Sequence, residues 1–363
     1  MKIVRGENKP GVADDIKLPS VEFLHSGATV LNLAGSNKGR DGGWARGRII
    51  NFVGDGSSGK TLLALELSAR CFYKIKEIIS KIYPGVKRIR IRYINAEQVM
   101  DFPVREMYNL RDKDGNIIDS FYENVEWVLD INTVEEMGRD LKRTIDSYKP
   151  GDFILYIVDS LDALTSEAAK KRFADAAKKD KEEDGSYNLE KAKYLSQSFF
   201  ANICADMSGK DITIVFISQV RQKIGVTFGE KQTRAGGKSL DFYTHQVVWL
   251  SELEKLKRQI QGDDWVYGIR VLAKFKRNKA AKPFREAEII ILFDYGLDDV
   301  SSSLAWLYGP KVKEMMFEGQ KYSRLELISH IEENRLEENL AEMVEEKWEI
   351  IDDALRPDRK AKF

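Results

Sequence analysis

One octapeptide has the residue types and spacing of a phosphate-binding loop. Residues 54–61 read Gly-Asp-Gly-Ser-Ser-Gly-Lys-Thr and match the pattern G-x-x-x-x-G-K-[S/T]. Glycines let the backbone pass close to phosphate oxygens, and the loop amides converge on them from the start of the following helix. Lys60 supplies charge to the β- and γ-phosphates, and Thr61 offers a hydroxyl to Mg²⁺. We therefore predict a nucleotide site built from Gly54, Asp55, Gly56, Ser57, Ser58, Gly59, Lys60 and Thr61.

The metal of such a site needs a second anionic group. Asp159 directly follows the apolar run 153–158, which suits the acid that P-loop ATPases place beside Mg²⁺ at the end of a buried strand. The next residue is Ser160 rather than a second carboxylate, so the base that activates water must come from elsewhere.

Two other strand ends offer groups for the reaction. Glu97 comes two residues after the run 90–95 and is our candidate for the base, with Asp162 as the weaker alternative. Gln219 ends the run 213–218, and its amide could contact a γ-phosphate or the attacking water. Sites in open α/β sheets lie at the carboxyl ends of the strands, so we expect these groups to meet there.

The elements that must position these groups alternate along the chain. Between about 26 and 300, short apolar runs rich in Ile, Val, Phe and Tyr alternate with helical stretches, which predicts an α/β fold with a mostly parallel sheet flanked by helices. The predicted strands lie at 48–53, 90–95, 153–158, 213–218, 268–275 and 287–293. A basic turn separates the last two.

Composition shifts divide the chain into three parts. Residues 1–25 are polar and broken by prolines and glycine, which predicts an extended arm. Residues 26–300 form the core, and 301–363 a small, mainly helical C-terminal domain. Its longest predicted helix covers 322–355, and the acidic half, 332–353, is expected to be a solvated face.

Composition also excludes several classes of protein. Lys plus Arg and Asp plus Glu each number 58 in 363 residues, so the chain has no globally basic coat, although a locally basic groove is still possible. Two cysteines and three histidines exclude a disulfide scaffold and a Cys/His zinc module. No apolar run is long enough to span a bilayer. We expect a soluble protein of a reducing compartment, with no membrane partner.

The segment 219–243, QVRQKIGVTFGEKQTRAGGKSLDFY, has the composition of a nucleic-acid-binding loop. Its cations are Arg221, Lys223, Lys231, Arg234 and Lys238. Glycines that free backbone amides for phosphate contacts are Gly225, Gly229, Gly236 and Gly237. Apolar side chains that could wedge between bases are Ile224, Val226 and Phe228. Because this loop follows Gln219 directly, nucleotide binding and DNA binding are expected to be coupled.

These motifs together resemble the bacterial RecA recombinase family. The segment 219–243 has the length and glycine placement of its second DNA-binding loop. GDGSSGKT, YINAEQVMD and YIVDSLDALT agree with its other motifs, and RNKAAKPFREAE resembles the basic turn that these proteins present to a neighbouring subunit. The resemblance covers about 26–300 and implies a RecA-type core that uses ATP and Mg²⁺.

The resemblance also implies roles for single residues. Glu97 matches the catalytic glutamate, Gln219 the γ-phosphate sensor and Asp101 the position that reads adenine. Arg277 and Lys279 fall where the family has two lysines that contact the neighbour's ATP. Ile224 matches the intercalating residue of the second loop, where Gly225, Phe228, Arg234 and Lys238 are further DNA candidates. In the same loop, the positions that match backbone contacts are Arg221, Lys223, Gly236 and Gly237. Near the first loop, Ser196 matches a DNA-contacting position, and Lys193 falls where the family has Arg.

The sequence departs from the family pattern in three places. The first DNA loop, within 166–189, is longer and has no evident apolar wedge, so a solvated helix and a DNA contact are both open. The arm 1–21 contains no recognisable N-terminal docking helix, and self-association must use another contact. The C-terminal domain matches only in kind. These departures suggest a diverged member from the cytoplasm of a bacterial cell, with a phage-encoded origin as an open alternative.

The leading interpretation is a DNA-dependent ATPase for recombination and repair. It would form ATP-loaded filaments on single-stranded DNA and catalyse pairing and strand exchange with homologous duplex DNA. Loading by single-strand-binding or mediator proteins stays open. The alternatives are a RecA-fold helicase or motor and a non-hydrolysing RecA-like regulator. A small-molecule kinase is disfavoured because nothing resembles a lid or an acceptor pocket.

Overall fold

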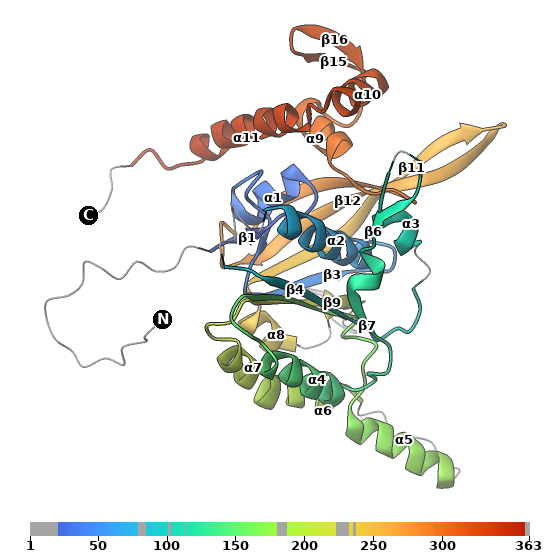
Figure 1. Cartoon of the computed structure of the whole chain (residues 1–363), viewed down its shortest axis with the longest axis vertical. Helices are drawn as coiled ribbons and strands as arrows, with labels where there is room; N and C mark the ends of the chain where they lie inside the picture. The colour runs from blue at the N-terminus through green and yellow to red at the C-terminus, as the bar shows by residue number, and fades with distance from the viewer. Residues whose placement is uncertain are drawn as a thin grey trace, which may run out of the picture.

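The computed structural model describes residues 21–78, 85–100, 103–112, 114–179, 187–222, 232–234 and 237–359. Within these residues the centre of the molecule is a ten-stranded mixed sheet with helices on both faces (Figure 1). The strand order is β14-β13-β12-β11-β3-β9-β8-β4-β7, and β10 (Gln232–Arg234) pairs with β9. This arrangement confirms the α/β architecture expected from the alternating pattern.

Six neighbouring strands of the sheet are parallel. They are β11 (Gln246–Ile260), β3 (Ile49–Gly54), β9 (Ile212–Gln222), β8 (Asp152–Asp159), β4 (Arg88–Asn95) and β7 (Val125–Val128). β3 and β8 are buried along their whole length, because helices cover both faces; this explains their mainly apolar sequences. The strands predicted at 48–53, 90–95, 153–158 and 213–218 are thus confirmed.

An antiparallel extension completes the sheet. β12 (Asp263–Asn278) pairs with β11, and β13 (Glu286–Leu292) and β14 (Gly296–Asp298) follow. β12 and β13 are the strand pair predicted at 268–275 and 287–293. β11 and the full length of β12 were not predicted. Their distal halves form a long hairpin that projects from the sheet (Figure 1).

Helices form a layer on each face. The helices of one side are α1 (Thr29–Ser36), α2 (Lys60–Ile78) and α3 (Val104–Tyr108). Those of the other are α4 (Val134–Asp146), α5 (Glu167–Lys179), α6 (Tyr187–Tyr194), α7 (Phe200–Asp206) and α8 (Gly237–Tyr243), with a π-helical turn at Leu195–Phe199. Each layer has its own apolar cluster, which includes Phe52 and Phe275 on the α1 and α2 side and Phe200 and Phe216 on the other. The sheet is therefore held by two separate cores.

Short pairs of strands lie outside the main sheet. They are β1 (Phe23–Leu24) with β2 (Trp44–Ala45), β5 (Leu110–Arg111) with β6 (Ile117–Asp119), and β15 (Glu314–Phe317) with β16 (Gln320–Ser323). A 3-10 turn at Tyr122–Asn124 precedes β7. The predicted arm 1–25 lies mostly outside the described residues.

The C-terminal part corrects one expectation. The single helix predicted over 322–355 is two helices, α10 (Arg324–Asn334) and α11 (Glu337–Ala354), after α9 (Asp299–Tyr308). The break occurs because Arg335 adopts the left-handed conformation, with φ 56°. Trp348 Nε1 donates to Asn37 Oδ1 at 2.8 Å, so α11 also packs against the core beside α1 and is not wholly a solvated helix.

Candidate ATP site and the opposite edge of the sheet

The predicted P-loop connects β3 to α2. The loop begins after Gly54, and α2 begins at Lys60. Gly59 has φ +85°, a backbone conformation that favours glycine. The Lys60 ammonium donates to the Asp55 carbonyl at 2.5 Å. Burial lowers the pKa of Lys60, and the negative charge of Asp159 partly offsets this effect. The loop is therefore folded around its own lysine.

Register brings the predicted groups to the carboxyl edge of the sheet. Gly54 at the end of β3 pairs with Gln219 of β9, and Asn95 at the end of β4 pairs with Asp159 of β8. Since β3, β9, β8 and β4 are adjacent and parallel, their carboxyl ends meet beside the P-loop. The expected convergence of strand ends is present.

Glu97 accepts hydrogen bonds from Ser160 and Gln219 at this edge of the sheet. Its Oε1 accepts from Ser160 Oγ at 2.8 Å and from Gln219 Nε2 at 3.3 Å. Asp162 Oδ2 accepts from the Gln219 backbone amide at 2.8 Å. Glu97 is exposed and could contact water, whereas Asp162 holds the Gln219 backbone in place. The geometry favours Glu97 over Asp162 as the base.

Asp159 is a buried carboxylate beside the P-loop lysine and threonine. Tyr93 donates its hydroxyl to Asp159 Oδ2 at 2.7 Å. Burial raises the pKa of Asp159, and hydrogen bonds from Tyr93 and Thr61 oppose that rise. Among the described residues no group of three or more His, Cys, Asp or Glu side chains could hold a metal. One hydroxyl and one carboxylate fit Mg²⁺ that takes its other ligands from phosphates and water.

A β-bulge controls where the two predicted trans cations point. β12 pairs Phe275 with Val248 and Arg277 with Val247, so Lys276 is the extra residue. Without the bulge, side-chain alternation would put Arg277 on the same face as Phe275. With it, Arg277 and Lys279 share the other face, where the Lys279 ammonium donates to the Phe242 carbonyl at 2.8 Å.

Most residues of the predicted second DNA loop lie outside the described part of the chain. These are Lys223, Ile224, Gly225, Phe228 and Gly236, and Asp101 lies outside as well. Arg221 is in β9, and Gly237 and Lys238 begin α8. β10 pairs antiparallel with the end of β9, so the loop returns to the strand from which it starts.

Arg234 differs from the surface cation that was expected. Its side chain is buried, and its guanidinium donates to Asn51 of β3 and pairs with Asp241 of α8. Burial lowers the pKa of Arg234. Asn51 also donates to the Phe216 carbonyl at 2.8 Å. Arg234 therefore anchors β10 to the sheet, and its charge is not on the surface.

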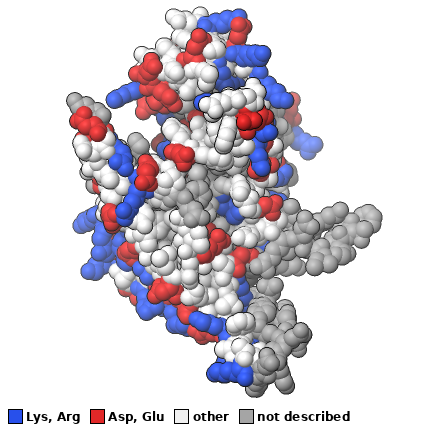
Figure 2. Space-filling view, turned by 90° about the vertical axis from the view of Figure 1, so that its right-hand side faces the viewer, with Lys and Arg blue, Asp and Glu red and all other residues white. Residues whose placement is uncertain are grey.

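The first-loop region contains helix rather than irregular loop. Residues 167–179 form α5, which projects from the body of the molecule (Figure 1). Lys193 and Ser196 are both exposed on the following helical segment, where the Ser196 hydroxyl donates to the Lys193 carbonyl at 3.1 Å. Figure 2 shows positive and negative side chains interspersed over the face from which α5 projects. On this face the described side chains do not gather into a single basic groove.

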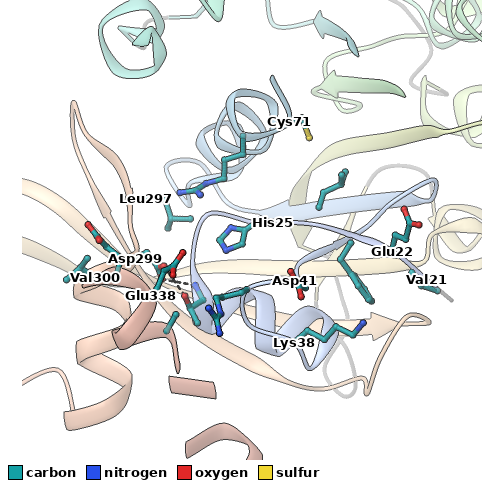
Figure 3. Close-up of a pocket in the computed structure, with 18 of the residues that line it drawn as sticks. Val21, Glu22, His25, Lys38, Asp41, Cys71, Leu297, Asp299, Val300 and Glu338 are labelled. Atoms are coloured by element: carbon teal, nitrogen blue, oxygen red, sulfur yellow. Dashed lines mark hydrogen bonds between the residues drawn. The ribbon is translucent and has the colours of Figure 1, made fainter. Parts of the chain in front are cut away.

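A separate cavity of about 970 Å³ lies away from the P-loop. It is bordered by β1, α1 and α2 on one side and by α9 and α11 on the other (Figure 3). His25 lies near its centre, and Asp299 and Glu338 lie along one wall. The Asp299 carboxylate is already satisfied by the Thr29 amide at 2.7 Å and the Thr29 hydroxyl at 2.9 Å. None of the P-loop residues lines this cavity.

Sequence reasoning missed three contributors to these sites. Tyr93 and Asn51 lie inside apolar strands, where a polar residue is a signal of a buried hydrogen bond. His245 lies beside Lys279 at the far edge of the sheet, and only the pairing of β11 with β12 reveals it. No described helix is long and apolar enough to cross a membrane.

The comparisons with known proteins agree with this geometry. The family model "RecA N-terminal domain" matches residues 126–298. Protein RecA of Synechocystis sp. is 29% identical over 284 residues, which are 78% of this chain and 68% of that protein. Protein RecA of Prochlorococcus marinus strain MIT 9211 is 31% identical over 284 residues, 78% of this chain and 65% of that protein.

The matches thus span about two thirds of the length of these relatives. An alignment of 284 residues in a chain of 363 must begin before residue 126, so the similarity extends beyond the region that the family model matches. The P-loop, Glu97 and Asp159 have the arrangement described above. This chain belongs to the RecA-like recombinase family.

Proposed function

We propose that the protein is a DNA-dependent ATPase that assembles head to tail on single-stranded DNA and hydrolyses ATP between protomers. In this proposal Glu97 activates the attacking water, Gln219 contacts the γ-phosphate, and Lys60, Thr61 and Asp159 hold the phosphates and Mg²⁺. Pairing of the bound strand with homologous duplex DNA and strand exchange follow from assembly.

The observation that carries the proposal is the distance between the cations and the chain's own P-loop. The Lys279 amide donates to the His245 carbonyl, and the His245 amide donates to the Ile49 carbonyl, both at 2.8 Å. Lys279 is therefore level with the start of β3, whereas the P-loop follows its end at Gly54. Five residues of strand span about 16 Å, more than a lysine or arginine side chain can reach.

Arg277 and Lys279 lie too far from the nucleotide site of their own protomer to contact it, but they could contact the nucleotide of a neighbouring protomer. Arg277 and Lys279 would supply positive charge to the γ-phosphate of the adjacent protomer in the transition state. Such a contact uses two different surfaces of each protomer, which generates a ring or an open helical filament. Hydrolysis then depends on assembly.

Coupling to DNA is supported by the position of Gln219. It belongs to β9, which ends at Gln222, immediately before the segment 223–231 that the sequence predicts to bind DNA. A γ-phosphate that holds Gln219 would order the loop, and hydrolysis would release it. Binding of ATP and of DNA should therefore strengthen each other.

The test mixes two inactive variants. Lys60→Ala removes nucleotide binding but leaves the cation face, and Arg277→Ala removes the cation but leaves the P-loop. In an equal, random mixture about one quarter of interfaces join an intact P-loop to an intact cation face, so ATP turnover on single-stranded DNA should recover toward that fraction. Recovery must rise with protein concentration.

Two outcomes would contradict the proposal. If Arg277→Ala alone keeps wild-type turnover, the cation does not act on ATP. If the wild type binds nucleotide without DNA-stimulated turnover, a non-hydrolysing regulator becomes the better interpretation.

A further inference from the structure

His245 occupies a position that the proposed mechanism does not use. It immediately precedes β11, and its carbonyl accepts from the Lys279 amide at 2.8 Å. Because Gln246 pairs with Asn278, His245 and Lys279 are the next facing residues of the two strands. Side chains of facing residues in an antiparallel pair lie on the same face, so the imidazole lies beside the trans cations.

The surroundings of His245 are positively charged. The groups that face it are Lys279, Arg48 ahead of β3, Arg277 of β12 and the backbone of Tyr243. Within the described part of the chain, Arg48, Arg277 and Lys279 form no ion pair with a carboxylate. Burial and the charge of Arg277 lower the pKa of Lys279. Cys204 of α7 raises it, and its contribution is the smallest of the three. Among the described residues, three cations thus share one region and none of them is paired with a carboxylate.

Two buried polar atoms in this region have no hydrogen-bond partner. They are His245 Nδ1 and Arg277 Nε. Buried polar atoms are nearly always hydrogen-bonded, so two without partners in one region are unusual. Both atoms are buried in the free protomer, so an anionic surface that docks here would compensate the charge of the cations around them rather than contact these two atoms directly.

We propose that His245 is a third group, with Arg277 and Lys279, that receives the anionic nucleotide site of a neighbouring protomer, and that it takes up a proton as the protomers assemble. The proposal rests on the proposed function, because it needs the neighbour's phosphates or Glu97 to be the docking anion. His245 acts here as a positioning residue that strengthens the interface.

The electrostatics of the free protomer support proton uptake. Burial, together with the positive charges of Lys279 and Arg48, lowers the pKa of His245 to about 4, so the imidazole is neutral near pH 7. A docked anion reverses the local charge and raises that pKa. A group whose pKa is higher in the assembled state favours assembly at low pH, and this contribution is lost as the pH rises through the assembled-state value.

The expected consequence is a pH-dependent assembly constant. Between the free-protomer pKa of about 4 and the assembled-state pKa, assembly tightens as the pH falls. Uptake of one proton changes the assembly constant by up to about tenfold per pH unit. Groups on ATP itself also titrate in this range, so the effect of His245 must be measured as a difference between variants.

The experiment compares the full-length wild type with His245→Asn and His330→Asn. Sedimentation on single-stranded DNA with a slowly hydrolysed ATP analogue gives the half-saturating protein concentration from about pH 7.5 to pH 6. The wild type and His330→Asn should tighten more than His245→Asn by at least about threefold over this range. His330 is the matched control because it lies in α10, stacked on Tyr322.

Binding of a fluorescent ATP analogue to dilute protomers is a second readout. His245→Asn should leave it unchanged, since His245 is at the edge opposite the P-loop. An equal pH dependence in the wild type and His245→Asn would overturn the inference while leaving the ATPase proposal intact. Failure of the wild type to form nucleotide-dependent complexes on DNA at any pH would instead overturn the proposed function and the inference with it.

Discussion

Replacement of Tyr93 by Phe should destabilise the protein through Asp159. The Tyr93 hydroxyl is fully buried and donates to Asp159 Oδ2 at 2.7 Å, and it is the largest influence that opposes the effect of burial on the pKa of that carboxyl. Phenylalanine fills nearly the same volume, so packing is retained and only the hydrogen bond is removed. The nucleotide-site carboxylate is then less well satisfied.

The size and pH dependence of the loss follow from this contact. A hydrogen bond to a charged group contributes about 1.5–3 kcal/mol, and one between neutral groups about 0.5–1.5 kcal/mol. Because burial raises the pKa of Asp159 above its unfolded value, ionisation costs folded-state stability, and that cost appears as the pH rises through the two pKa values. Tyr93→Phe should therefore lose about 1.5–3 kcal/mol near pH 7.5 and about 1 kcal/mol once Asp159 is protonated.

Urea unfolding at several pH values measures this loss, and Tyr156→Phe is the matched control. Tyr156 lies in β8 and donates to Asp140 Oδ2 at 2.9 Å, but Asp140 keeps two hydrogen bonds from Arg92 at 2.9 and 2.6 Å. Its replacement removes one of three hydrogen bonds to an ion-paired carboxylate and should cost about 1.5–3 kcal/mol near pH 7.5. If Asp159 holds Mg²⁺ as proposed, Mg²⁺ with ATP should reduce the loss in Tyr93→Phe and leave the Tyr156→Phe loss unchanged.

The reasoning is refuted if Tyr93→Phe is as stable as the wild type at neutral pH. It is refuted equally if the loss is the same at acid and neutral pH, because the hydroxyl would then not act on the charged carboxylate.

Two further predictions concern other contacts. Glu97→Gln should keep nucleotide binding but give long-lived ATP-loaded complexes on DNA, since Ser160 can still donate to the amide oxygen; rapid turnover in a single-round hydrolysis assay would exclude Glu97 as the base. Asp352→Asn should weaken docking of α11 by about 1 kcal/mol, and this figure is small because the Lys282 partner is half exposed. Lys282 holds the pKa of Asp352 below its usual range, so the loss should vanish as the pH falls and Asp352 becomes protonated. Thermal unfolding measures it, with the exposed Asp353→Asn as control; equal effects of the two variants would contradict the role of the buried pair.

The parallel half of the fold was predictable because burial on both faces leaves a plain signal. The run 153–158 is apolar throughout, and Asp159 follows it directly. The projecting part of β11 and β12 was not predictable in the same way. Its side chains are mostly exposed on both faces, so neither continuous nor alternating hydrophobicity marks it.

Long-range contacts set the limit for the functional sites. The grouping of Glu97, Asp159 and Gln219 could be predicted because all three lie at or near the carboxyl ends of neighbouring parallel strands. Arg234 was assigned to the surface because its neighbours in sequence are polar and basic, while its burial depends on Asn51, 183 residues away. The break at Arg335 was missed because a non-glycine residue rarely ends a helix in the left-handed conformation.

The separation of the P-loop and the cation cluster along β3 gives any head-to-tail assembly a direction. One terminal protomer would present a nucleotide with no cations against it, and the other would present cations with no nucleotide. Loss of subunits from the first end cannot be driven by trans hydrolysis of its own ATP, whereas every internal site can hydrolyse. Growth and shrinkage would then follow different rate laws at the two ends, and a protomer that lacks one surface would act as a cap on one end only.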